Sequence, residues 1–179
     1  MGAFSPARTG HPVGLAAPFE RVTVAQAFER FADTPEPEML RLAYEDQDRF
    51  FRLLVDSVEP ALEATDRPVF LHRYPANMAS LARLCPADPR YAERFELYFR
   101  GLELSNGFGE LCDAREQRQR FERDQRERAL AGLPVYPIDH AFLDALEEGM
   151  PPSAGNALGI DRLVMLALGA ARIADVLAF

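Results

Sequence analysis

The stretch Tyr91-Ala-Glu-Arg-Phe-Glu-Leu-Tyr-Phe-Arg-Gly-Leu-Glu-Leu-Ser-Asn-Gly-Phe-Gly-Glu-Leu111 decides the fold of this 179-residue chain. Apolar and polar residues alternate on both sides of Arg100-Gly101. A glycine between two alternating runs indicates a hairpin, because such a turn needs a positive φ and glycine adopts it without strain. With these two residues in the turn, the predicted pairs are Phe99 with Leu102, Tyr98 with Glu103, and Glu96 with Ser105.

The two faces of the predicted hairpin differ in character, since successive side chains of a strand point to opposite faces. One face is apolar and is predicted to be the core. The other carries Glu96 and Glu103 as diagonal neighbours, with their Cβ atoms about 7 Å apart. The apolar face holds Phe95, Leu97, Phe99, Leu102 and Leu104, and the opposite face holds Glu96, Tyr98, Glu103 and Ser105.

Two carboxylates this close on a half-buried sheet repel each other unless one is protonated or a cation lies between them. Mg²⁺ takes oxygen ligands and usually brings a nucleotide phosphate, so it fits the pair. An amide, an aromatic ring and a third carboxylate follow just past the strand, at Asn106, Phe108 and Glu110. The alternative, which the spacing leaves open, is an exposed hairpin face with two solvated glutamates.

Composition excludes several function classes. The net charge of −8 argues against nucleic acid as the main partner. All 20 basic residues are arginine, so Schiff-base chemistry and a P-loop lysine are ruled out. The two cysteines lack metal-ligand spacing, which favours a reduced, cytoplasmic protein. No run of roughly 18 apolar residues is present, so no membrane association is expected.

The remaining patterns predict an α+β fold, with helices flanking an antiparallel sheet. Residues 1–20 are expected to be a disordered leader, because they carry proline and glycine without periodicity. The long helix expected at 113–131 holds six arginines among carboxylates, and a solvated, salt-bridged face is favoured there over a nucleic-acid-binding stripe. Further helices are expected at 24–32 after the N-cap Thr23, at 38–58, 78–84 and 140–148, and as a buried helix at 159–169; strands are expected at 68–74 and 154–158.

A second group of residues lies where the last strand meets the last helix. Gly155 and Gly159 allow a flat ligand to approach the backbone closely. Arg162 falls in the first turn of the helix, where its guanidinium can clamp a phosphate or stack on a base. The alternative is a helix-start arginine paired with Asp161 or another acid.

These motifs together resemble the C-terminal half of the catalytic domain of class II lysyl-tRNA synthetases, and the last segment resembles that class's motif 3. The chain is more similar to the shorter lysine ligases that act on elongation factor P and lack an anticodon-binding domain. The resemblance covers residues 21–179. It rests on Glu96, Glu103 to Leu111, Asp113-Ala-Arg-Glu-Gln117, Arg120-Phe121, Gly132-Leu-Pro, Pro137-Ile-Asp, Gly149-Met-Pro and Gly155 to Gly169.

The resemblance implies a role for each matching residue. Glu96 and Glu103 would hold Mg²⁺, and Arg162 would act catalytically on the γ-phosphate side of ATP. ATP would also contact Glu103, the Leu104 backbone and Gly159. The amino-acid substrate would contact Asn106, Phe108, Glu110 and Ala157, with Glu110 pairing to its ammonium group. The methyl group of Ala157, where the synthetases tend to have glycine, would crowd an α-amino group and leave space for a β-amino group.

The activity implied is ATP-dependent activation of lysine or β-lysine as an adenylate, followed by transfer to a lysine of elongation factor P. A homodimer is a further partner that the resemblance brings, and tRNA is disfavoured. Motif 1 and motif 2 of the class have no counterpart in residues 1–20. The chain is therefore expected to be truncated and inactive alone, and a lysyl-tRNA synthetase fragment or a non-catalytic remnant that binds ATP or protein stays open.

Overall fold

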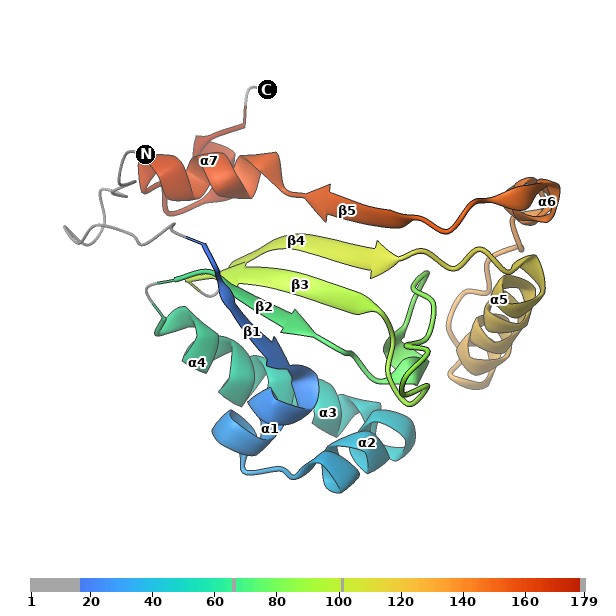
Figure 1. The fold of residues 1–179 in the computed structure, drawn as a ribbon, viewed down its shortest axis with the longest axis horizontal. Coiled ribbons are helices and arrows are strands. Elements are labelled where there is room, and N and C mark those ends of the chain that lie inside the picture. Colours follow the sequence, from blue (N-terminus) through green and yellow to red (C-terminus); the bar gives the residue numbers. More distant parts are fainter. Residues whose placement is uncertain (1–16, 66, 101, 178–179) are drawn as a thin grey trace.

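A computed structural model describes residues 17–65, 67–100 and 102–177 of the chain. Within them, five strands form one sheet in the order β1-β2-β3-β4-β5, in which β1 and β2 are parallel and the other neighbours antiparallel. The strands are β1 (Glu20–Thr23), β2 (Val69–His72), β3 (Arg94–Phe99), β4 (Leu102–Gly109) and β5 (Ala154–Leu158). The mixed helix and strand content confirms the predicted α+β class, with a mainly antiparallel sheet flanked by helices (Figure 1).

Helices occupy most of the sequence between and after the strands. They are α1 (Val24–Ala32), α2 (Glu36–Glu45), α3 (Gln47–Leu53), α4 (Glu59–Glu63), α5 (Ala114–Leu130), α6 (His140–Gly149) and α7 (Ile160–Leu168), with a π-helical turn η1 (Leu54–Val58) and 3₁₀ turns η2 (Ala76–Met78) and η3 (Ile173–Asp175). Thr23 caps α1 as predicted, since its hydroxyl accepts from the Gln26 N–H at 3.1 Å and the Gln26 side chain accepts from the Thr23 N–H.

The prediction of one unbroken helix over 38–58 is wrong, because the structure has α2, α3 and η1 there. The chain leaves helical geometry at Asp46, where φ is −148°, and the Asp46 carboxylate then accepts from the Arg49 N–H at 3.0 Å. An aspartate that bonds the backbone three residues on offers the chain a new helix start, and this is the local competition that periodicity misses. The result is a pair of short helices that wrap the core instead of one rod.

The main core lies between α1 to α4 and one face of β1 to β3. Val69, Leu71 and Tyr98 supply the sheet side of it. All four helices lie together on one side of the sheet in Figure 1. This side is the face that carries Glu96 and Tyr98, so the prediction that the opposite face forms the core is wrong for the larger cluster. The helix side comprises Val24, Ala27, Phe28, Met39, Leu42, Ala43, Phe50, Leu54, Val58 and Leu62.

The face predicted as core is covered over a smaller area, by α7. Phe99 and Leu104 are buried there, and Leu166 of α7 packs against them. The expectation that α7 is a buried helix is wrong, because Met165 is its one buried residue among those described. Its exposed apolar side chains are Ile160, Leu163, Val164 and Leu168, and Leu158 on the neighbouring edge strand β5 is also exposed.

Helices α5 and α6 lie beyond the end of β4 (Figure 1). The helix predicted at 113–131 is confirmed as α5, which begins after the N-cap Asp113 and carries salt-bridged arginines as predicted, among them Arg120, 2.5 Å from Glu116. The short helix predicted at 78–84 is absent from the described structure. Instead, the residues after η2 form two isolated β-bridges within the chain, from Ala82 to Glu110 and from Leu84 to Ala92.

The prediction of a disordered leader over residues 1–20 is wrong at its C-terminal end. Glu20 is the first residue of β1, and the centre of the Phe19 ring lies 6.2 Å from that of the Phe70 ring. The rest of that prediction, residues 1–16, lies outside the described residues. Over the part of the chain that the structure describes, no helix combines the length and apolarity needed to cross a bilayer.

Arg120 ties α5 to the segment before β3. Its Nη1 donates to the carbonyls of Ser80 and Ala82, both at 2.7 Å, and the residue is 7% exposed. We predict that Arg120→Met lowers the free energy of unfolding by roughly 2–4 kcal/mol, because the buried Ala82 carbonyl and the part-buried Ser80 carbonyl lose a charged donor. Urea unfolding measures it, and Arg123→Met on the exposed side of α5 is the control, expected within about 0.5 kcal/mol of the parent. Equal effects of the two substitutions would contradict the structural role.

Candidate functional site

A β-bulge between β3 and β4 sets which side chains share a face. Leu97 is opposite Ser105 and Tyr98 is opposite Glu103, so Leu104 is an extra residue without a partner. The predicted pairs at Tyr98 and Phe99 are confirmed, but Glu96 is opposite Asn106 instead of Ser105. An extra residue reverses the alternation beyond it. Asn106 therefore joins Glu96 and Glu103 on one face, and Ser105 goes to the other.

Three rows of side chains run across β3, β4 and β5 on this face. Glu96, Asn106 and Ala157 are directly opposite one another in the central row. The row beside it, in the direction of the β4 C-terminus, joins Arg94, Phe108 and Gly155, and the row on the other side pairs Tyr98 with Glu103. The predicted substrate residues Asn106, Phe108 and Ala157 are thus brought together with the predicted metal residues Glu96 and Glu103.

Glu96 is almost fully buried, at 6% exposure, and both of its oxygens are hydrogen-bonded. Arg94 Nη2 and Asn106 Nδ2 donate to Oε1 at 2.6 and 3.2 Å. The hydroxyls of Tyr74 and Tyr98 donate to Oε2 at 2.5 and 2.8 Å. A buried carboxylate needs such charged and polar donors to remain ionised. Together the four donors satisfy both oxygens of Glu96.

Glu59 at the start of α4 adds a third carboxylate to this region. Its Oε1 lies 3.3 Å from the Tyr98 hydroxyl. Burial raises the pKa of Glu59, and the charges of Glu96 and Glu103 raise it further against the hydrogen bond from Tyr98, which lowers it. Burial likewise raises the pKa of Tyr98, with the Glu96 carboxylate as the next cause. The face is therefore rich in negative charge and suited to a cationic ligand.

The amino-acid end of the site has an acceptor without a partner. Asn106 Oδ1 is buried and receives no hydrogen bond from the described residues, although Asn106 Nδ2 is bonded to Glu96. The Glu110 carboxylate lies over Gly155, at a place that a Cβ on Gly155 would fill. Phe108 packs beside Ala79, Ala82 and Ala92, under the guanidinium of Arg94. An orphaned amide oxygen and a carboxylate around an apolar floor suit an ammonium group.

The four residues predicted to contact ATP also lie together. The Gly159 N–H donates to the Leu104 carbonyl at 2.8 Å, which fixes the start of α7 against β4. Arg162 Nη1 donates to the Glu103 carbonyl at 2.5 Å and lies 3.6 Å from Glu103 Oε2. Arg162 is about half exposed, so this pairing leaves its guanidinium open to an anion. The alternative interpretation, in which Arg162 at the start of the helix pairs with an acidic residue, is therefore what the structure shows, and the acid is Glu103.

Of the two carboxylates predicted to hold Mg²⁺, Glu103 is the one that fits the ion bound together with phosphate, because both oxygens of Glu96 already accept hydrogen bonds from four donors. Mg²⁺ is typically held by one or two carboxylates and completes its octahedron with water and substrate phosphate oxygens. The described residues contain no group of three or more side chains arranged to hold a metal ion by themselves. These residues therefore do not form an all-protein metal cage. Glu103 suits a metal that arrives with a nucleotide, and Glu96 would have to release one of its donors to join it.

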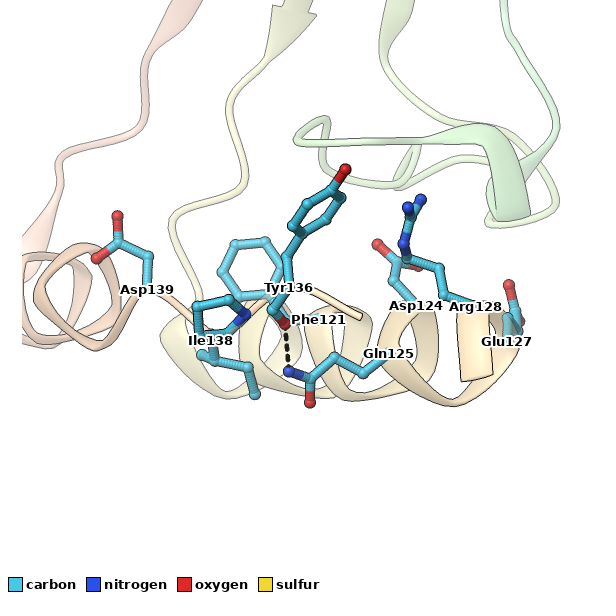
Figure 2. Close-up of a pocket in the computed structure, with 9 residues that line it drawn as sticks. Phe121, Asp124, Gln125, Glu127, Arg128, Tyr136, Ile138 and Asp139 are labelled. Atoms are coloured by element: carbon cyan, nitrogen blue, oxygen red, sulfur yellow. Dashed lines mark hydrogen bonds between the residues drawn. The ribbon is translucent and has the colours of Figure 1, made fainter. Parts of the chain in front are cut away.

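Two surface grooves flank α5, and none of the predicted site residues lines either one. The groove in Figure 2 has a volume of about 450 Å³ and lies between α5 and the segment 134–139. Gln125 Nε2 donates to the Tyr136 carbonyl at 2.6 Å, and the Arg128 guanidinium lies 4.6 Å from the Tyr136 ring (Figure 2). The second groove, of about 660 Å³, lies between α5 and the segment 76–89. The candidate site is the sheet face described above.

Sequence reasoning missed Tyr74, Arg94 and Glu59 as members of this face. Arg94 lies two residues before Glu96 in the same strand, so strand alternation could have found it. Tyr74 and Glu59 come from segments outside the hairpin, and no local pattern connects them to Glu96. Their placement depends on how β2 and α4 pack beside β3.

Comparison with known proteins identifies relatives over most of the chain. Residues 5–179 match the family described as tRNA synthetases class II (D, K and N). An elongation factor P-(R)-β-lysine ligase of Erwinia tasmaniensis is 48% identical over 180 residues, which is 91% of this chain and 55% of that protein. Proteins of the same name from Photorhabdus laumondii and Edwardsiella ictaluri are 49% and 58% identical over 177 and 136 residues, covering 89% and 75% of this chain and 54% and 42% of those proteins.

The chain spans about half the length of the curated relatives that it matches over most of its own length. The match includes the hairpin, α5 and the β5–α7 segment, which carry the candidate site. From the site geometry and this match, the chain belongs to the class II tRNA synthetase family of the D, K and N type.

Proposed function

We propose that this chain is the C-terminal part of the catalytic domain of an ATP-dependent ligase, which attaches lysine or β-lysine to elongation factor P in the cytoplasm. The names of the relatives support the substrates, and membership of the synthetase family supports ATP and Mg²⁺. The single observation that carries the proposal is the central row Glu96, Asn106, Ala157 on an otherwise acidic face, with the buried Asn106 Oδ1 unpartnered.

The proposed reaction has two steps. A carboxylate oxygen of the amino acid bonds to the α-phosphorus of ATP as pyrophosphate leaves. The amine of a lysine on elongation factor P then bonds to the carbonyl carbon as AMP leaves. Chemistry of this kind depends on positioning and on neutralising charge. Bound Mg²⁺ would neutralise phosphate charge beside Glu96 and Glu103.

The residues of this chain have separate tasks in that reaction. Glu110 and Asn106 Oδ1 accept hydrogen bonds from the ammonium groups of the amino acid, and Phe108 supports its aliphatic part. Arg162 exchanges its contact with Glu103 for the phosphates of ATP, a substitution that its exposure and the 3.6 Å separation favour. Gly159 keeps the start of α7 close to β4, since its N–H is bonded to Leu104.

Transfer to elongation factor P is favoured over tRNA charging by Ala157. Its methyl group lies directly opposite Asn106, so it narrows the site beside the unpartnered amide oxygen. A methyl at this place leaves less room for an α-amino group than glycine does. The alternative of a remnant that binds ATP or a protein without catalysis is separated from the ligase by the exchange experiment below.

The first prediction concerns the metal. Glu103→Gln removes one of the two carboxylates proposed to hold Mg²⁺ and is expected to weaken Mg·ATP binding about tenfold or more without loss of the fold. Calorimetric titration with ATP, in Mg²⁺ and in a chelator, measures it. Glu93→Gln serves as the control, since Glu93 is paired with Arg83 away from the central row. Equal ATP binding by the parent with and without Mg²⁺ would rule out the metal role.

The second prediction concerns the amino acid. Ala157→Gly, in a chimera that joins residues 21–179 to the N-terminal part of the Erwinia relative, is expected to shift preference from β-lysine toward lysine several-fold. The physical reason is the methyl group opposite Asn106. Pyrophosphate exchange with each amino acid gives the ratio. Ala154→Gly on the same strand, opposite Gly109, is the matched control. An unchanged ratio would remove Ala157 from the specificity argument.

The third prediction is that residues 1–179 alone do not form the adenylate. ATP brings about four negative charges to a face that already holds Glu96 and Glu103, while Arg94 is paired with Glu96 and Arg162 with Glu103. The loss of one oriented donor from such a site typically costs about 10²–10³ in rate. ATP–pyrophosphate exchange with lysine, β-lysine and Mg²⁺ is expected to equal that of a Glu103→Ala control. Exchange above this control would contradict the prediction, and exchange by the chimera would separate the ligase from a remnant.

A further inference from the structure

Glu110 is a carboxylate of the candidate site whose oxygens remain open to a ligand. Its backbone is fixed against β5, since the Glu110 N–H donates to the Ser153 carbonyl at 3.0 Å. Among the residues that the structure describes, none donates a hydrogen bond to its carboxylate oxygens or forms an ion pair with them. An ionised carboxylate can accept several hydrogen bonds, so an ammonium group can still bind here.

The side chain of Glu110 leans along β5 toward the middle of the site. The pairing of β4 with β5 continues one step past Gly109 and Ala154, so Glu110 is directly opposite Ser153. Its Oε1 nevertheless lies over Gly155, which is two residues closer to Ala157. Diagonal neighbours on one face of an antiparallel pair are within reach of a long side chain. The lean therefore carries the carboxylate away from Ser153 and toward the row of Ala157.

Gly155 is what gives the carboxylate this room. Gly155 is opposite Phe108, and a Cβ built on it would overlap Glu110 Oε1 and lie 3.3 Å from Glu110 Cδ. Apart from the chain neighbours of Gly155, Glu110 supplies the only described atoms within 4 Å of that place. The backbone itself does not call for glycine, because Gly155 is not among the described glycines with a positive φ. The missing side chain thus serves Glu110.

We propose that Gly155 is a positioning residue, whose missing side chain lets the Glu110 carboxylate lie beside Phe108, where it pairs with an ammonium group of the amino acid. This inference rests on the proposed function, in which Glu110 binds the amino acid. Gly155 is assigned no contact with the substrate and acts through Glu110. A methyl group at this place would turn the carboxylate away from the site, and a displacement of about 1 Å is enough to weaken an oriented contact strongly.

The experiment compares Gly155→Ala with the parent chain, residues 1–179. Equilibrium dialysis with radiolabelled lysine and β-lysine measures the affinity for each amino acid. Both affinities are expected to fall about tenfold or more, because the ammonium group loses a charged hydrogen-bond partner. The urea midpoint of unfolding is expected to stay at or above that of the parent. The added Cβ meets only the far end of a flexible side chain, and alanine suits a strand better than glycine does.

Asn156→Ala is the control on the same strand. Asn156 is exposed and follows Gly155 directly, so strand alternation points its side chain to the opposite face of the sheet. Its affinity for both amino acids is expected to match that of the parent. A loss in this control as large as in Gly155→Ala would overturn the inference, because any change in β5 would then weaken binding.

A Glu110→Asp background tests whether Gly155 acts through Glu110. The aspartate carboxylate is one methylene shorter and retreats from Gly155, so Gly155→Ala is then expected to change affinity less than about twofold further. An equal loss in both backgrounds would overturn the inference, as would parent-like binding by Gly155→Ala. Failure of Gly155→Ala to fold would overturn it too, because the backbone itself would then need the glycine.

Glu110→Gln separates this inference from the proposed function. If Glu110→Gln lowers amino-acid affinity and Gly155→Ala does not, the role of Glu110 stands and the inference alone fails. If the parent chain binds neither amino acid, or if Glu110→Gln binds both as the parent does, the amino-acid end of the proposed function and this inference fail together.

Discussion

The bulge at Leu104 is the constraint on which the candidate site depends. In a regular hairpin, Glu103 and Asn106 would point to opposite faces, because they are three positions apart and side chains alternate. The unpartnered Leu104 reverses that alternation, so the carboxylate and the amide face the same side. The same residue turns its own side chain toward Phe99 and Leu166, where α7 packs on the sheet. One extra residue thus brings the proposed metal and substrate residues onto one face and joins the sheet to the last helix.

The second requirement of the site is the compensation of buried negative charge. Burial raises the pKa of Glu59, and the charges of Glu96 and Glu103 raise it further. Glu96 itself is nearly inaccessible to water. Arg94 and two tyrosine hydroxyls donate hydrogen bonds to Glu96. Hydrogen bonds from several segments restrict the Glu96 carboxylate, although Arg94 Nε and Asn106 Oδ1 are buried without a partner among the described residues. The unpartnered Asn106 oxygen marks the place where this network stops and a ligand would begin.

The outer surface of the described structure is uneven. The side of the sheet under α1 to α4 is densely packed, whereas α7 and β5 leave Leu158, Ile160 and Leu168 exposed. The sequence also spans about half of its relatives' length. The lack of lysine gives every cationic contact to arginine, and near the site Arg94 and Arg162 each meet a carboxylate. If the chain binds ATP as proposed, these two arginines would have to offset the phosphate charge as well as the carboxylates.

The sequence by itself determined the local elements and the motif. The Arg100-Gly101 turn with alternating flanks predicted β3 and β4, and Thr23 predicted where α1 begins. These features were accessible because capping and strand alternation act over a few residues. The α+β class followed from the same signals, and the family followed from residues in register.

Tertiary structure alone decided which face of the hairpin meets the core. Alternation marked Phe95, Leu97 and Phe99 as the apolar face, yet α1 to α4 pack on the face of Tyr98. Alternation along a strand cannot tell which of two partly apolar faces will be covered, because that depends on which face the other segments of the chain pack against. The bulge, the break at Asp46 and the meeting of Tyr74 and Glu59 with Glu96 have the same origin. Each depends on contacts between segments distant in sequence, and such contacts leave no local pattern.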